Sequence, residues 1–100
     1  MASLLERLIG QQLLRFNQSK DGLSIEFSAA RVVVFNPVST GNLREYVGSK
    51  VQALRYLETE YCLFAFSNGK TLSVSLLDKD FSGPEAFCVT FTDGVVVVAP

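Results

Sequence analysis

The chain has 100 residues, 48% of them apolar, which is enough for one compact domain over residues 1–100 with a single core. Nine Lys and Arg residues against ten Asp and Glu residues give a formal net charge of −1. Proteins that bind nucleic acid usually carry a basic surface that neutralises phosphates. The charge balance therefore argues against a nucleic-acid partner.

The first ten residues contain a short apolar stretch that Glu6 and Arg7 interrupt, so we expect no signal peptide. No segment approaches the roughly 20 apolar residues that cross a bilayer, so we expect no membrane association. Cys62 and Cys88 are too few for a disulfide framework, and free thiols are typical of a reducing compartment. These features predict a cytoplasmic protein.

Two stretches of the sequence resemble each other at an offset of 38 residues. LERLIGQQLLRF (5–16) aligns with LREYVGSKVQAL (43–54), and Gly10 falls on Gly48. The apolar spacing before each glycine predicts a helix of about two turns, too short to be stable unless it docks on a sheet. One inserted residue later, IEFSAARVVVF aligns with FAFSNGKTLSV. We interpret this pattern as a duplicated helix–βββ unit, at about residues 3–37 and 41–76.

The segments after each predicted helix have the pattern of β-strands. Leu23, Ile25 and Phe27 alternate with polar residues, a period of two that places one face inward. Asn68-Gly69 is a two-residue hairpin signal, because both residues accept positive φ. Asp93-Gly94 predicts a further hairpin over residues 85–99.

The predicted order is thus helix, three strands, helix, three strands, a loop and two strands. Tight turns favour antiparallel pairing, so we expect a mainly β (α+β) fold, either an antiparallel meander sheet or a partly closed barrel. The apolar final strand Val95–Ala99 is a candidate edge strand. An uncovered apolar edge pairs readily with another chain, which predicts a homo-oligomer formed through this strand.

The stretch LLDKDFSGPEAF (76–87) holds the densest group of acids and begins like a calcium loop, with the spacing D-x-D-x-S-G from Asp78. An EF-hand loop needs a glutamate at its twelfth position, where this chain has Val89. We therefore predict no metal site and interpret the segment as a solvated turn. A calcium site of another kind, formed by Asp78, Asp80 and Glu85, stays open as an alternative.

Catalytic side chains are few. The sequence contains no histidine, so neither cysteine has an imidazole to activate it. Glu58 and Glu60 could act as an acid–base pair, but they lie in a predicted turn where exposed acids are ordinary. We predict a protein that is not an enzyme, with no catalytic residue and no cofactor.

A binding role remains. The stretch FSNGKTLSVSL followed by DFSGPEAF resembles small uncharacterised bacterial β-rich proteins, some of them immunity proteins of polymorphic toxin systems. The resemblance implies a protein partner, a toxin domain that is neutralised by occlusion. The predicted partner-binding residues, which would meet a basic surface, are Asp78, Asp80, Phe81, Glu85, Glu58 and Glu60. The alternative is a β protein that binds calcium or a small molecule, the latter in a pocket lined by Phe side chains.

Overall fold

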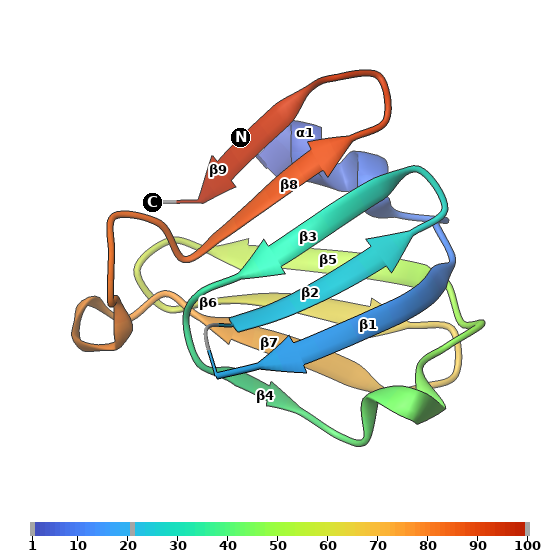
Figure 1. Cartoon of the computed structure of the whole chain (residues 1–100), viewed down its shortest axis with the longest axis horizontal. Coiled ribbons are helices and arrows are strands. Elements are labelled where there is room, and N and C mark those ends of the chain that lie inside the picture. Colours follow the sequence, from blue (N-terminus) through green and yellow to red (C-terminus); the bar gives the residue numbers. More distant parts are fainter. Residues whose placement is uncertain (1, 21, 100) are drawn as a thin grey trace.

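The fold was analysed in a computed structural model that describes residues 2–20 and 22–99. The described residues form two antiparallel sheets, which lie one behind the other (Figure 1). Almost no helix is present: α1 (Ala2–Leu5) is followed by three 3-10 turns, η1 (Glu6–Leu8), η2 (Leu43–Glu45) and η3 (Asp78–Asp80). The strands are β1 (Leu13–Ser19), β2 (Gly22–Phe27), β3 (Ala30–Val34), β4 (Val38–Thr40), β5 (Val51–Leu57), β6 (Tyr61–Phe66), β7 (Thr71–Ser75), β8 (Phe87–Phe91) and β9 (Val96–Ala99).

The front sheet in Figure 1 has the order β1-β2-β3-β8-β9, and the sheet behind it has the order β4-β7-β6-β5. Both predicted hairpins are present, between β6 and β7 and between β8 and β9. Only the glycine of each pair adopts positive φ, Gly69 at 84° and Gly94 at 93°, so the predicted positive φ at both residues is wrong. The prediction of a mainly β, antiparallel fold is therefore confirmed. The described strands do not form one continuous meander, and they do not close into a barrel.

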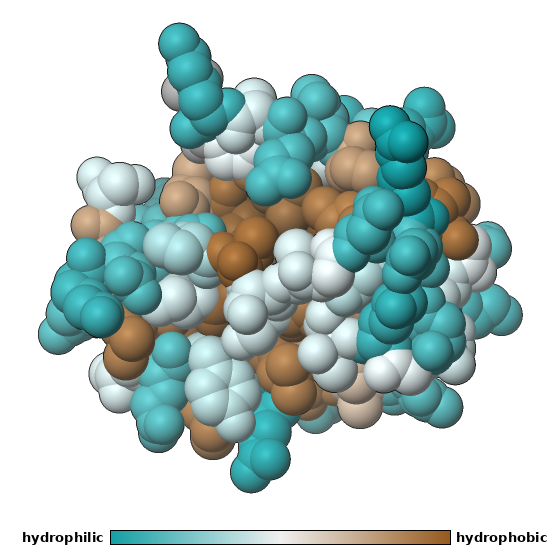
Figure 2. All heavy atoms as spheres, turned by 90° about the horizontal axis from the view of Figure 1, so that it is seen from below, coloured by the Kyte–Doolittle hydropathy of each residue, from teal (hydrophilic) through white to brown (hydrophobic). Residues whose placement is uncertain are grey.

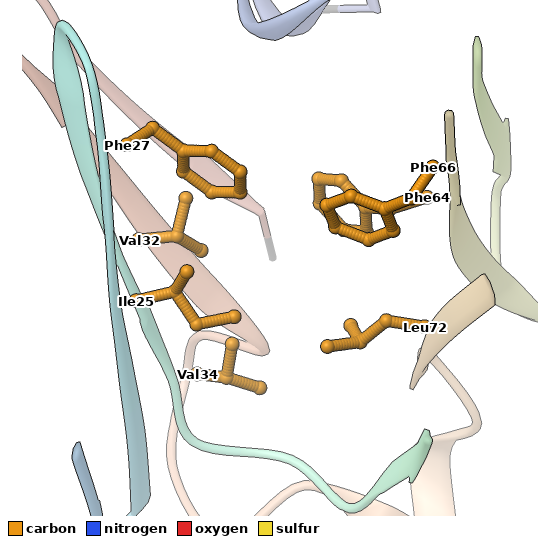
Figure 3. Close-up of a pocket in the computed structure, with 7 residues that line it drawn as sticks. All are labelled: Ile25, Phe27, Val32, Val34, Phe64, Phe66 and Leu72. Carbon is orange, nitrogen blue, oxygen red and sulfur yellow. The ribbon is translucent and has the colours of Figure 1, made fainter. Parts of the chain in front are cut away.

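The core lies between the two sheets. Alternate residues of each central strand point inward, as the period of two predicted, and β2 and β6 share the same burial pattern. Figure 3 shows Phe27 of the first sheet and Phe66 of the second pointing toward each other, and their rings stack with centroids 6.4 Å apart. Tyr46, from the segment before β5, packs edge-on against Phe66 at 5.2 Å. Aromatic contacts between the layers thus hold the sheets together.

The two sheets meet at one corner through an isolated antiparallel bridge between Gln12 and Lys50. Four backbone hydrogen bonds surround this bridge, and each has a counterpart displaced by 38 residues. In the first pair, Gly10 N–H donates to Val51 O (2.7 Å) and Gly48 N–H donates to Leu13 O (2.8 Å). In the second pair, Leu13 N–H donates to Ser49 O (2.9 Å) and Val51 N–H donates to Gln11 O (3.0 Å). The corner therefore has approximate two-fold symmetry.

Two serines repeat this symmetry. Ser28 Oγ accepts a hydrogen bond from Gln12 N–H (3.2 Å), and Ser67 Oγ accepts one from Lys50 N–H (3.0 Å). The pairing of β1 with β2 and that of β5 with β6 also shift register at the same place, just after Leu13 and just after Val51. The two three-stranded groups β1–β3 and β5–β7 are thus built around equivalent contacts.

The predicted helix–βββ unit is not supported, because the two helices of about two turns are absent from the described residues. The segment before β1 is one turn of α-helix followed by the turn η1, and the segment before β5 contains only η2. Leu8 and Leu43 are buried, so the apolar stripe packs on the sheets without a regular helix. Segments this short lack the length to form a stable helix, and Gly10 and Gly48 end them with φ near 90°.

The sequence also failed to predict β4, a three-residue strand that pairs with β7. It follows Pro37 and lies at the lower edge of the molecule in Figure 1. Seen from below, this side shows apolar atoms between polar side chains (Figure 2). Among the described residues no helix is long and apolar enough to cross a membrane.

Candidate functional site

The loop between β7 and β8, residues 76–86, projects from one end of the molecule (Figure 1, left). It begins at the buried Leu76 and ends at the buried Ala86, whose carbonyl accepts hydrogen bonds from Phe35 N–H (2.9 Å) and Asn36 N–H (3.1 Å). Between these anchors the chain forms the turn η3 and exposes Asp78. Hydrophilic atoms gather at this end of the molecule in Figure 2.

The loop borders a surface hollow of about 370 Å³ that we call the acidic–aromatic hollow. Its lining residues are Tyr56, Glu58, Thr59, Leu76, Asp78, Phe81 and Gly83. Three of the six predicted partner-binding residues, Glu58, Asp78 and Phe81, therefore lie around one hollow. They come from two separate segments, the turn between β5 and β6 and the loop 76–86.

The floor of this hollow is aromatic. Phe81 is half-buried and packs against the core. Tyr56 is half-buried on β5. Burial raises the pKa of Tyr56, and the negative charges of the Cys62 thiolate and the Glu58 carboxylate raise it further. Tyr56 therefore keeps its phenolic proton, and its ring remains a neutral aromatic surface.

The rim of the hollow is acidic, and its carboxylates, those of Glu58 and Asp78, form no ion pair with a described Lys or Arg. The described residues form four ion pairs, which use the carboxylates of Glu26, Glu45 and Asp93. None of these four pairs involves Glu58 or Asp78. The carboxylates at the hollow are thus available to a cation from outside the chain.

The other predicted residues lie elsewhere on the same end. Asp80 Oδ2 accepts a hydrogen bond from Ser75 Oγ (2.5 Å), which fixes the loop, and its side chain lines a neighbouring hollow. Glu85 lines a third hollow together with Phe35. Glu60 is exposed in the turn after β5, where its carbonyl accepts a hydrogen bond from Leu76 N–H (3.0 Å). The structure therefore does not assemble all six residues into one surface.

The sequence did not single out Tyr56, Thr59 or Leu76 as parts of the site. The only signal was the spacing Y-L-E-T-E, which places Tyr56 two residues before Glu58. Thr59 adopts φ 65°, which is rare for a β-branched residue, and its hydroxyl donates to Glu58 O (2.6 Å). This turn holds Glu58 at the rim.

The neighbouring hollow, of about 400 Å³, lies at the matched place in the first half of the molecule. Gln18 and Lys20 line it, and these residues correspond to Tyr56 and Glu58 at the offset of 38. Asn36 also lines it: its Nδ2 donates to Ser75 O (2.8 Å), while its buried Oδ1 has no partner among the described residues. This hollow has a mixed polar and apolar lining with one ring, Phe35, and one acid, Asp80, whereas the first hollow has two rings and two acids.

The two cysteines are free thiols, with Cys62 buried and Cys88 partly exposed. Burial raises the pKa of Cys62 to about 12, so it is a protonated thiol near neutral pH. The described residues contain no group of three or more His, Cys, Asp or Glu side chains that could hold a metal ion. Between the seven apolar side chains of Figure 3, all of them described, no space of the size of a water molecule remains.

Comparisons with known proteins give no family for this chain. No family model matches it, and the searches of curated proteins and of solved structures found no similar protein. The functional argument therefore depends on the geometry of the molecule itself.

Proposed function

We propose that the protein is a protein-binding module whose acidic–aromatic hollow receives a basic side chain of a partner. The observation that supports the proposal is the combination found there: two half-buried rings, Tyr56 and Phe81, bordered by Glu58 and Asp78, whose carboxylates form no ion pair within the described chain. The two neighbouring hollows, which contain Asp80 and Glu85, each join only one ring, Phe35, to one acid.

A guanidinium or ammonium group fits this arrangement on physical grounds. A cation over an aromatic face gains about 0.5–2 kcal/mol, more where water is excluded. An arginine also presents a planar fork of donors to a carboxylate, and its stem packs on rings. Glu60 and Glu85 on the same end extend the negative field, which speeds the approach of a basic partner more than it adds affinity.

Neutralisation of a toxin domain by occlusion is the more specific form of this proposal, and it derives from the resemblance to immunity proteins. A loop that covers a basic active-site surface would act in this way without any catalytic residue. Co-expression with a toxin encoded beside this gene tests the specific form, because only the matching toxin should lose its activity. Growth arrest that co-expression fails to relieve would contradict it and leave the general binding role to be tested separately.

The general role can be tested by photo-cross-linking in the native host. We expect a photoreactive phenylalanine analogue at position 81 to capture a protein partner, because Phe81 forms the floor of the hollow. Capture should disappear when Glu58→Lys and Asp78→Lys are added, since the hollow then repels a cation.

The matched control carries the same analogue at position 14. Leu14 lies on β1, in the other sheet from Tyr56, and is 43% exposed, so it is more accessible than the half-buried Phe81 but does not line the hollow. Equal capture from positions 14 and 81, or capture that the two charge reversals leave unchanged, would contradict the proposal.

A further inference from the structure

The last strand of the front sheet, β9, is an edge strand. It pairs with β8 on one side, and no described strand pairs with its other side. Its sequence, VVVA, contains no charge and no proline. Open edges of this kind pair readily with further strands, and most proteins protect them.

The other edges of the two sheets are protected. β4 has three residues and follows Pro37. β1 and β5 carry the exposed Arg15 and Arg55, are irregular after their first residues, and meet each other at the corner of the two sheets. Charges, proline, short length and bulges are the usual means of preventing edge pairing. β9 has no charge, no proline and no register shift, although it has only four residues.

The hydrogen-bond pattern shows which backbone groups of β9 face the open edge. Phe91 N–H donates to Val95 O (2.8 Å), just outside the aligned pair Thr90–Val96. In an antiparallel ladder this makes Thr90–Val96 a non-hydrogen-bonded pair and Val89–Val97 the bonded one. The N–H and C=O of Val96, and by the same alternation those of Val98, therefore point away from β8.

The side chains of the same two residues are exposed on the outer face of the front sheet. Val96 is 54% exposed and Val98 is 36% exposed. Val98 lies opposite Cys88, which in turn lies opposite Val33, so an apolar row crosses the outer face and ends at β9. The edge is thus apolar both along the strand and on the face beside it. Figure 1 shows α1 behind the β8–β9 hairpin.

We propose that β9 pairs antiparallel with β9 of a second copy of this chain, with Val97 on the two-fold axis. In this register Val96 of one copy lies opposite Val98 of the other, so the outward N–H and C=O groups of both residues find partners. The four outer valines come together, and the apolar row continues from one copy into the other. Because the strand carries no charge, a two-fold pairing brings no like charges together.

A second copy fits this edge better than an unrelated strand, because one register satisfies every outward backbone group and joins the two apolar rows. The contact is short, so it belongs to the class of small interfaces that form weak dimers. We therefore expect a monomer–dimer equilibrium that depends on protein concentration.

Sedimentation equilibrium of the full chain tests the proposal. The weight-average mass should rise from 11.0 kDa toward twice that value as the concentration increases. Val98→Pro removes an outward N–H without removing a bond to β8, so it should weaken dimerisation at least tenfold. Val98→Thr keeps the N–H group and a side chain of similar shape, and it should dimerise with a dissociation constant within a few-fold of the parent value.

Amide hydrogen exchange of the unmodified protein provides a second readout that does not depend on a variant folding. The amides of Val96 and Val98 should become slower to exchange as the concentration rises, while that of Val97, already bonded to β8, should not change. A mass that stays at 11.0 kDa with unprotected Val96 and Val98 amides would overturn the proposal. A dimer that Val98→Pro leaves intact would also overturn it. The same holds if the β9 amides exchange more slowly only after a different protein is added.

Discussion

The turn between β1 and β2 and the turn between β5 and β6 occupy matched places in the two halves, yet they border hollows of different chemistry. Where the first half has Gln18 and Lys20, the second has Tyr56 and Glu58. The contacts at the corner of the sheets are shared, down to the serine hydroxyls of Ser28 and Ser67. The backbone framework is therefore common to both halves, and the hollows differ because different side chains line them at the two turns.

The strongest test of the shared framework is the aromatic contact between the halves. Phe27 and Phe66 are at equivalent ends of β2 and β6 and stack on each other. We expect Phe27→Ala and Phe66→Ala each to lower the free energy of unfolding by about 3–5 kcal/mol, because each leaves a cavity between the sheets. The double variant should lose about 0.5–1.5 kcal/mol less than the sum, since the ring contact is lost only once.

Urea unfolding followed by circular dichroism measures these values. If one variant loses less than about a third of the unfolding free energy that the other loses, the two halves do not contribute equally to the core. That result would contradict a shared framework.

A difference between the halves should appear at Tyr46, whose counterpart at the offset of 38 is Leu8. Both are fully buried, but the Tyr46 hydroxyl donates to Thr71 O (2.5 Å) and accepts from Gly41 N–H (3.0 Å). Tyr46→Phe leaves both backbone groups without this partner and should cost about 1–3 kcal/mol in unfolding free energy.

Leu8→Met is the matched control, a swap of similar volume that should cost less than about 1.5 kcal/mol. Chemical denaturation of both variants gives the comparison. A Tyr46→Phe protein as stable as the parent would show that these two hydrogen bonds contribute nothing.

The serine contacts at the corner should have smaller and equal effects. Ser28→Ala and Ser67→Ala each remove the acceptor of one backbone N–H, that of Gln12 or of Lys50. Each should cost about 0.5–1.5 kcal/mol. The difference between them should be below about 0.5 kcal/mol if the corner is symmetric, as thermal unfolding of the two variants can show. A larger difference between the two unfolding free energies would show that the two serine contacts are not equivalent.

The last effect concerns the buried thiol of Cys62 and is absent at neutral pH, because it appears only at alkaline pH. Burial raises the pKa of Cys62 from about 9 to about 12, so folding favours the protonated thiol. The unfolded chain releases this proton first, and the stabilisation present below pH 9 is therefore lost as the pH rises from 9 toward 12. Cys62→Ala should lose this part of the pH dependence.

Labelling with a thiol reagent at pH 8 provides an independent measurement. The reagent should modify Cys88 in the folded protein and Cys62 only on unfolding, because Cys62 is buried. Rapid labelling of Cys62 in the native protein would contradict the burial on which the pH argument depends.

Much of the fold could be predicted because its signals are local. Alternation in LSIEF and the turns at Asn68-Gly69 and Asp93-Gly94 depend on neighbouring residues alone, and the structure confirms them. The helices were wrong because an apolar stripe before Gly10 or Gly48 fits a 3-10 turn as well as two turns of helix. β4 was missed because three residues carry no measurable period.

The site was predicted only in part for a different reason. Acids at positions 58 and 78 could be read from the sequence, but they lie at one hollow only because the loop 76–86 lies beside the turn after β5. That contact joins segments 20 residues apart and has no local signal. The aromatic floor followed from the same contact, so Tyr56 could not be assigned to the site in advance.

The central claim is that the acidic–aromatic hollow binds a basic side chain and that its counterpart does not. An NMR titration with N-acetyl-argininamide tests it most directly, with N-acetyl-norleucinamide as the uncharged control. We predict saturable shifts of the Thr59 and Gly83 amides with the arginine compound alone, no matching shifts of Gln18 and Gly22, and loss of the response in Glu58→Gln/Asp78→Asn. Equal shifts at both hollows, or none at Thr59 and Gly83, would contradict the claim.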